Sequence, residues 1–172
     1  MIDTVPAGEE IYLQPGEVWF GRAPARVRTL LGSCVAITLW HPQRGLGGMC
    51  HYMLPERPPE RGGEPDGRYA PDAMQLLLHA IVRHGARPAD FEAKLFGGGR
   101  MFNAQAELSG PGAVQARNVQ VARELVRRHG MPIRAEHLGG HGHRLLVFDL
   151  ADGAAWLKHT PLQTDDTTWG PP

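Results

Sequence analysis

The sequence has few cysteines, no excess of charge of either sign and no long apolar stretch. Its 172 residues include 18 basic and 18 acidic side chains, so the formal net charge is zero. A neutral chain lacks the broad positive field that attracts phosphate backbones, and we expect no nucleic-acid partner. No apolar stretch approaches the roughly 20 residues of a membrane-spanning helix, and the acidic N-terminal region has no signal-peptide pattern. These absences predict a cytoplasmic protein without membrane insertion.

Cysteine is scarce, whereas glycine and proline are abundant. The two cysteines, Cys34 and Cys50, are expected to remain free thiols in a reducing compartment. The 22 glycines and 15 prolines predict short elements and many turns, so loops should carry the function. The length suits one domain, which we place at residues 1–159. The polar, proline-ended segment 160–172 is predicted to be a mobile tail.

The apolar pattern predicts a mixture of strands and helices. Two runs rich in apolar residues, 34–40 and 46–54, are joined by a short turn and predict a β-hairpin. Helical spacing of apolar residues, with Pro71 in the first turn and Gly85 as the stop, predicts a first helix, and 116–129 predicts a second. The polar stretch 55–68 is long enough to be a lid or binding loop. Further strands are expected at the following segments: 93–96, 133–138, 145–150 and 154–158.

The strongest chemical signal is a thiol and an imidazole on the two strands of the predicted hairpin. Cys34 follows Gly32-Ser33, and His51 lies on the next strand. An imidazole beside a thiol lowers the thiol pKa and accepts its proton, so the pair could act as nucleophile and base. Taken singly, each could equally be a buried core residue. Cys50 adjoins His51, but neighbouring strand residues face opposite sides of a sheet, which predicts Cys50 in the core.

Two other groups of residues are weaker signals. The triple glycine 97–99 lacks the Lys-Ser/Thr of a P-loop and is read as a close approach of backbone near a site. Four histidines late in the chain match no standard zinc spacing, and we expect neither a metal nor another cofactor. They are His129, His137, His141 and His143. A zinc site built from Cys34, Cys50 and His51 remains an alternative.

Five blocks of sequence together resemble CheD, the family of chemoreceptor glutamine deamidases. They extend over roughly residues 16–155 and occur in the family's order. The blocks are LGSCVAITLW with GLGGMCHYMLP, RYAPDAM, AKLFGGGRMF, ARNV and LGGHGHRLLVF. The resemblance implies an α+β fold, a mixed β-sandwich with flanking helices, similar to the cysteine-hydrolase toxins that deamidate glutamine. It also implies a protein-glutamine glutaminase that converts receptor glutamines to glutamate, with glutamate methyl esters as further candidate substrates.

The resemblance also assigns roles to particular residues. It implies Cys34 as nucleophile, His51 as base and Thr29 as the third catalytic member, with Arg28 occupying the neighbouring place. Backbone groups at Gly32 and Ser33 are then candidates for an oxyanion hole.

The late glycines and the second helix supply the substrate-proximal candidates, which are Gly98, Gly99, Arg117 and Asn118. The chain departs from the family pattern at two places. His137 stands where an acidic residue is common, and Val114-Gln115 stands where Ile-Gly is common. We expect these departures to affect substrate or partner contacts more than catalysis.

The implied partners are methyl-accepting chemotaxis receptors, with a CheC-type phosphatase as a further candidate. A competing hypothesis is a non-catalytic module of the same fold that binds a receptor or such a phosphatase. The presence of both Cys34 and His51 favours the enzyme over the binding module.

Overall fold

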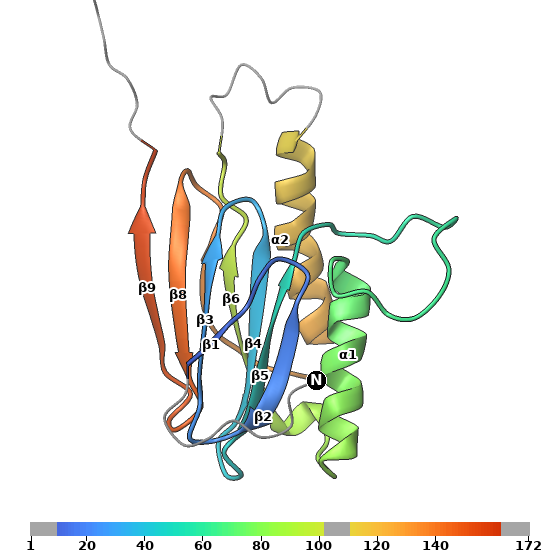
Figure 1. Ribbon diagram of the computed structural model, residues 1–172, viewed down its shortest axis with the longest axis vertical. Coiled ribbons are helices and arrows are strands. Elements are labelled where there is room, and N and C mark those ends of the chain that lie inside the picture. Colours follow the sequence, from blue (N-terminus) through green and yellow to red (C-terminus); the bar gives the residue numbers. More distant parts are fainter. Residues whose placement is uncertain (1–9, 102–110, 163–172) are drawn as a thin grey trace, which may run out of the picture.

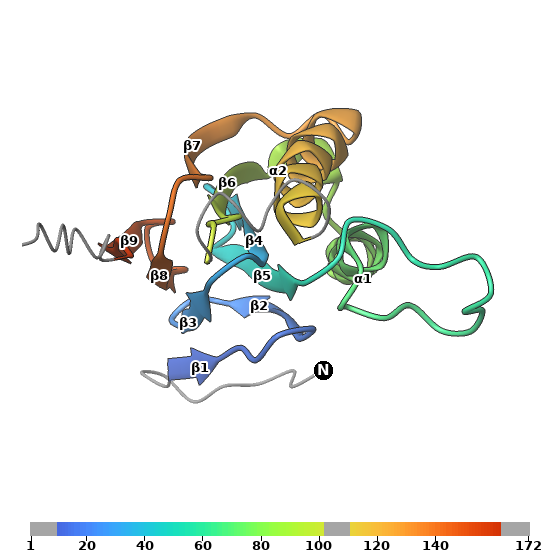
Figure 2. The same ribbon diagram turned by 90° about the horizontal axis from the view of Figure 1, so that it is seen from above.

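Two β-sheets stack face to face, and two helices cover the outer face of one of them (Figure 1). The computed structural model describes residues 10–101 and 111–162. Seen from above, the four-stranded sheet and the helices lie on opposite sides of the five-stranded sheet (Figure 2). The architecture confirms the predicted α+β fold with a mixed β-sandwich.

The five-stranded sheet contains the predicted hairpin at its centre. β4 (Val35–His41) and β5 (Leu46–Tyr52) pair antiparallel, and their residues are almost all buried because both faces of this sheet are covered. The strand order is β2-β5-β4-β6-β7, and only the last pair is parallel. The other three strands are β2 (Val18–Arg22), β6 (Glu92–Gly97) and β7 (Ile133–Leu138).

The four-stranded sheet has one covered face and one face toward solvent. Its strands show the alternating burial that this arrangement requires, most clearly in β3 and β8. The order is β1-β3-β8-β9, with β1 parallel to β3 and the other pairs antiparallel. The strands are β1 (Glu10–Tyr12), β3 (Arg26–Leu31), β8 (His143–Asp149) and β9 (Ala155–Thr160).

Both predicted helices are present, and each buries one face on the five-stranded sheet. α1 (Ala70–Arg83) begins with a proline in its first turn, as expected, and packs on β5 and β2. α2 (Pro111–Arg128) starts five residues earlier than predicted and packs on β4, β6 and β7. The prediction missed the first turn because that turn lacks helical spacing of apolar residues. The helix nevertheless begins at Pro111, since proline is favoured at a helix start. A short 3-10 helix, Pro88–Asp90, precedes β6.

The loop at 55–68 extends to the side of α1 (Figure 1). Asp72 in the first turn of α1 holds it, since its carboxylate accepts hydrogen bonds from the Arg57 side chain at 2.6 Å and from the Asp66 backbone at 2.9 Å. A role as lid or binding loop stays a prediction. The predicted tail lies largely at 163–172, outside the described residues.

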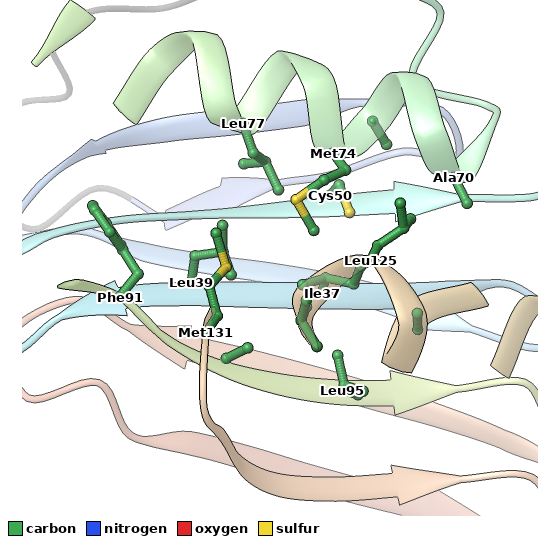
Figure 3. Close-up of a cluster of buried hydrophobic side chains, with 14 of the residues drawn as sticks. Ile37, Leu39, Cys50, Ala70, Met74, Leu77, Phe91, Leu95, Leu125 and Met131 are labelled. Atoms are coloured by element: carbon green, nitrogen blue, oxygen red, sulfur yellow. The ribbon is translucent and has the colours of Figure 1, made fainter. Parts of the chain in front are cut away.

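The apolar core forms two layers, one on each face of the five-stranded sheet. Ile37, Cys50 and Leu95 face the helices and meet side chains such as Met74 of α1 (Figure 3). The layer between the two sheets holds alternate residues of the same strands, including Ala36. The period of two along each strand thus sorts its side chains between the two layers.

Candidate active site

A chain of hydrogen bonds joins the two sheets at the ring of His51. The Thr29 hydroxyl of β3 lies 2.6 Å from Nδ1 of His51 on β5, and it donates its proton to the Leu13 carbonyl at 2.8 Å. Because a hydroxyl has a single proton, Thr29 must accept from the ring, which fixes the proton of a neutral imidazole on Nδ1. Nε2 is then the basic nitrogen. Both side chains are buried, with His51 only 1% exposed.

Thr29, not Arg28, lies at the ring. Strand alternation turns Arg28 outward, where its guanidinium pairs with Glu10 at 2.9 Å. Thr29 is wholly buried. Of these two neighbouring residues, Thr29 is therefore the one that contacts the His51 ring, and its catalytic role stays a prediction.

Cys34 lies in the connection from β3 to β4, at the same end and on the same face of the hairpin as His51. Ala36 is the direct cross-strand partner of His51, and Cys34 precedes Ala36 by two residues. Cys34 is half-buried and packs against the layer between the sheets. Such diagonal positions are roughly 7–8 Å apart at Cα, within reach of long side chains. Within the described residues, no hydrogen bond joins the thiol to the ring.

The triple glycine fixes the backbone of the cysteine loop. The N–H of Gly98 donates to the Cys34 carbonyl at 2.8 Å, and that of Gly99 donates to the Gly32 carbonyl at 3.0 Å. Gly97 has φ of +111°, and a Cβ there would overlap the Cys34 carbonyl oxygen. The predicted close approach of backbone is confirmed. The carbonyls of Gly32 and Cys34 are therefore both engaged by the triple glycine.

The oxyanion candidates lie in this same loop. Among the described residues, the N–H groups of Ser33 and Cys34 have no backbone hydrogen bond. Gly32 contributes its carbonyl to the bond with Gly99. The arrangement leaves two adjacent N–H donors beside the thiol, but their role at an oxyanion stays a prediction.

Burial keeps both candidate catalytic groups neutral in the free protein. It lowers the pKa of His51 to about 4, against a weaker opposing effect of the Glu17 charge. It also raises the pKa of the Cys34 thiol, despite hydrogen bonding that acts in the other direction. The sequence pattern predicts that the imidazole lowers this thiol pKa. In the free protein that expectation is not met, because desolvation of the sulfur dominates.

Cys50 lies on the opposite face of β5, in the helix-side core (Figure 3). It is fully buried, and burial raises its pKa to about 12. Its prediction as a core residue is confirmed. Because Cys50 and His51 face opposite layers, the alternative zinc site has no common centre. Among the residues that the structure describes, no three or more His, Cys, Asp and Glu side chains gather in a group that could hold a metal ion.

The two candidates on α2 have structural contacts. Arg117 forms an ion pair with Glu56 at 3.0 Å, which connects α2 to the start of the 55–68 loop. Asn118 is fully buried and donates to the Met53 carbonyl at 2.9 Å, while the Tyr52 hydroxyl donates to the Asn118 backbone carbonyl at 2.5 Å. These bonds fix α2 against the end of β5. Proximity to a substrate stays a prediction for both residues.

Arg144 is a buried residue near the site that our sequence analysis did not single out. Its Nε donates to His137 at 2.7 Å and a terminal nitrogen donates to the Gly139 carbonyl at 2.5 Å, so it connects β8 of one sheet to β7 of the other. Along β8, Arg144 alternates in phase with the buried Leu146 and Phe148. That phase is the signal from which its burial could have been predicted.

A half-buried thiol, a ring that presents Nε2 as base and a buried hydroxyl that orients the ring are the components of a cysteine-dependent hydrolase site. A family model described as CheD chemotactic sensory transduction matches residues 53–159. The chain belongs to the CheD family. The matched segment begins just after His51 and covers α1, α2 and the strands from β6 onward.

Curated relatives extend the likeness over most of the chain. A probable chemoreceptor glutamine deamidase CheD of Pseudomonas syringae pv. tomato is 49% identical over 158 residues, 91% of this chain and 93% of that protein. The probable chemoreceptor glutamine deamidase CheD 1 of Chromobacterium violaceum is 47% identical over 156 residues, 90% and 80% of the two chains. No helix among the described residues has the length and apolar character needed to cross a membrane.

Two solved structures are similar at low identity. The hypothetical protein YfiH of Bacillus licheniformis has a TM-score of 0.44 at 16% identity, over 70% of this chain and 49% of that chain. YlmD of Geobacillus stearothermophilus has a TM-score of 0.47 at 12% identity, over 77% and 60%.

Proposed function

We propose that this chain is a chemoreceptor glutamine deamidase, a cysteine-dependent amidohydrolase that acts in the cytoplasm on methyl-accepting chemotaxis receptors. It converts selected glutamine side chains to glutamate and releases ammonia. The observation that carries the proposal is the hydrogen bond from Nδ1 of His51 to Thr29, which leaves Nε2 as a base on the face that the ring shares with Cys34. The names of the curated relatives give the substrate.

The first half of the reaction forms a thioester. Nε2 of His51 takes the proton of the Cys34 thiol, and the sulfur attacks the carbonyl carbon of the glutamine carboxamide. The N–H groups of Ser33 and Cys34 stabilise the negative oxygen, with each such donor typically contributing about 3 kcal/mol. The imidazolium then protonates the amide nitrogen, the C–N bond breaks, and ammonia leaves.

The second half releases glutamate. His51 accepts a proton from water, whose oxygen attacks the thioester carbon. The C–S bond breaks, and the proton returns from the ring to the Cys34 sulfur. Thr29 orients the ring throughout, since its contact is to the other nitrogen. The same steps with an alkoxy leaving group would hydrolyse a glutamate methyl ester.

The resting pair is a neutral thiol and a neutral ring, because burial opposes charge on both groups. Proton transfer from Cys34 to His51 therefore has to accompany substrate binding, when the carboxamide and the loop N–H groups can stabilise the sulfur. This arrangement limits the reactivity of the thiol toward other compounds until a substrate is bound.

The decisive experiment compares Cys34→Ala with Cys50→Ala on a receptor fragment that carries glutamine. We expect wild type and Cys50→Ala to release ammonia and to add the roughly one dalton that replacement of NH2 by OH gives, and Cys34→Ala to release none above background. Cys50→Ala is the matched control, since it removes a thiol from the core at some cost in stability but none in chemistry.

Two results would contradict the proposal. If Cys50→Ala folded but lost turnover while Cys34→Ala stayed active, Cys50 and not Cys34 would be the nucleophile. No ammonia from wild type would favour the non-catalytic module that binds a receptor or a CheC-type phosphatase. A pull-down with each of those two candidates would then identify which of them is bound.

A further inference from the structure

The turn at 139–142, which joins β7 to β8, supports the triple glycine that holds the cysteine loop. The N–H of Gly139 donates to the Gly97 carbonyl at 2.9 Å, and the N–H of Arg100 donates to the Gly140 carbonyl at 2.7 Å. The triple glycine in turn donates two hydrogen bonds to the carbonyls of the cysteine loop. Two successive sets of backbone hydrogen bonds therefore connect this turn to the candidate nucleophile.

Side-chain packing contributes little to the position of the turn. A Cβ at Gly139 or Gly140 would meet no atom within 4 Å. A cavity of about 420 Å³ lies between the turn and α2, beside Gly98 and Gln115. Both turn glycines have a positive φ, which glycine adopts without strain. Hydrogen bonds therefore have to fix where the turn lies.

Arg144 is the side chain that connects this turn to both sheets. One terminal nitrogen donates to the Gly139 carbonyl at 2.5 Å, and Nε donates to Nδ1 of His137 at 2.7 Å. Arg144 stands opposite Leu31, the residue of β3 after which the cysteine loop begins. A Cβ at Gly99 would lie 3.2 Å from the other terminal nitrogen, which has no hydrogen-bond partner among the described residues. The guanidinium thus lies against the triple glycine as well as the turn.

The partners of this buried cation are neutral. Arg144 is only 2% exposed, and its acceptors among the described residues are a ring nitrogen and a backbone carbonyl. Burial lowers its pKa, but an arginine keeps its charge at any pH at which the protein is folded. Arg144 therefore always presents a donor at Nε, and the bond to His137 depends on the state of the ring.

His137 can accept this bond only while its Nδ1 carries no proton. The neutral ring must then carry its hydrogen on Nε2, whereas a protonated ring would present a second donor and a second positive charge to Arg144. The residue is exposed, so water can supply the proton. The neighbouring carboxylate does not compensate the added charge, because Glu136 pairs with Arg123 of α2 at 2.8 Å.

Among the described residues, Arg144 from β8 and His159 from β9 are the charged or titratable side chains that face this ring. The ring centroids of His137 and His159 are 5.2 Å apart, and β6 places the apolar Phe96 beside His137 in the parallel register. Desolvation lowers the pKa of His137, and the charges of Arg144 and His159 act in the same direction. The ring is therefore protonated only below its ordinary value of 6.5.

We propose that Arg144 is a positioning residue for Cys34, which it supports through the turn at 139–142, and that this support requires an unprotonated His137. Protonation of His137 breaks its bond to Arg144, and the turn, the triple glycine and the cysteine loop lose the support that they share. The inference rests on the proposed deamidase function for its activity measurements. It adds a dependence on pH that Cys34 and His51 alone do not set.

The first test is the variant His137→Asn in the ammonia assay, with a receptor fragment as substrate between pH 7.5 and 5. Asparagine places an oxygen at about the position of Nδ1, so it accepts from Arg144 but does not titrate. At pH 7.5 its kcat should be within about twofold of wild type. At pH 5 wild type should have lost at least about threefold more kcat than the variant, with KM unchanged in both.

His84→Asn is the matched control for the histidine. Nδ1 of His84 also forms a hydrogen bond, to the Ala80 carbonyl at 2.7 Å, but it does so at the end of α1. This variant should keep the pH profile of wild type.

The second test removes the cation. Arg144→Met keeps an unbranched apolar side chain but donates no hydrogen bond, so kcat should fall about tenfold while KM stays within about twofold. Arg26→Met is its control, since Arg26 lies at the other end of the β3–β8 pair and bonds Asp149 at 2.8 Å. It should keep the kcat of wild type.

Amide hydrogen exchange measures the support directly. After correction for the intrinsic effect of pH on exchange, the N–H groups of Gly98 and Gly139 should exchange faster in Arg144→Met than in wild type at pH 7.5. Wild type should show the same increase on going to pH 5, whereas His137→Asn should not.

The outcomes separate this inference from the deamidase activity. Parallel pH profiles for wild type and His137→Asn would overturn the inference, as would wild-type kcat in Arg144→Met, and the deamidase proposal would stand because ammonia is still released. If Arg144→Met does not fold, the profile and the amide exchange of His137→Asn decide. If wild type releases no ammonia, the deamidase proposal fails, and amide exchange alone decides whether Arg144 supports the cysteine loop.

Discussion

Thr29 is the residue on which the orientation of the candidate base depends. Its hydroxyl accepts from His51 and donates to the Leu13 carbonyl, so one side chain satisfies two buried groups from different parts of the chain. Sequence pattern alone does not predict this contact, because nothing in local periodicity pairs strands of different sheets. The resemblance to a known family supplied Thr29 as a candidate, and the geometry shows what its hydroxyl contacts.

We expect Thr29→Val to reduce both turnover and stability. The valine has the shape of threonine but no hydroxyl, so the ring loses its orientation and two buried polar groups lose their partner. The kcat of deamidation should fall about a hundredfold, and the free energy of unfolding by about 2 kcal/mol.

The control for this prediction is Thr38→Val, measured by the same ammonia assay and by urea unfolding. Thr38 is also buried, but its hydroxyl makes a single long hydrogen bond of 3.4 Å to the Lys94 carbonyl. The variant Thr38→Val should therefore keep the turnover of wild type and most of its free energy of unfolding. Equal losses in the two variants would show that Thr29 has no particular function in the site.

At the scale of elements, the hairpin and α1 could be predicted from sequence because their signals are local. β4 and β5 are apolar runs joined by a short turn, and α1 has a proline start, helical spacing and a glycine stop. The cavity beside Gly98 could not be predicted, since its wall comes from three segments that are distant in sequence. Only the fold brings Gly98, Gln115 and His141 together.

Gly97, the last residue of β6, limits the shape of the cysteine loop, which predicts a strong effect of Gly97→Ala. The alanine would have an unfavourable positive φ, and its Cβ would overlap the Cys34 carbonyl oxygen. We expect a loss of about 3 kcal/mol in the free energy of unfolding, together with most of the ammonia release.

Gly85→Ala is the control for Gly97→Ala. Gly85 also has a positive φ, +64°, but a Cβ there would meet no atom within 4 Å. Thermal unfolding should show a smaller loss of about 1 kcal/mol, with activity unchanged. If Gly97→Ala lost no more stability and no more activity than Gly85→Ala, the close approach of Gly97 to the cysteine loop would not be required for function.

At the scale of the whole molecule, the buried ring of His51 makes folding sensitive to acid. Its folded pKa of about 4 lies below the ordinary 6.5, so the unfolded chain binds the proton more readily. The contribution of His51 to the free energy of unfolding is therefore complete above pH 6.5 and is lost as the pH falls toward 4. The difference corresponds to about 3 kcal/mol.

Urea unfolding between pH 7.5 and 4 tests this prediction. The free energy of unfolding should fall across this window in wild type and fall less in His51→Gln. Burial also lowers the pKa of His137. The variant His137→Gln therefore measures how much of the pH-dependent loss of stability comes from this second histidine. Identical pH profiles for wild type and His51→Gln would contradict the prediction.

Leu13, next to the edge strand β1, helps to determine which nitrogen of the His51 ring carries the proton, because its carbonyl accepts the proton of the Thr29 hydroxyl. Leu13 is held by a 2.8 Å bond from its N–H to the Arg28 carbonyl, directly after the strand that pairs parallel to β3. Without its carbonyl, nothing would hold the threonine proton away from the ring, and Thr29 would be free either to accept from Nδ1 or to donate to it. A truncation through residue 14 would therefore remove the contact that keeps Nε2 unprotonated, although Thr29, His51 and Cys34 would all still be present in the chain.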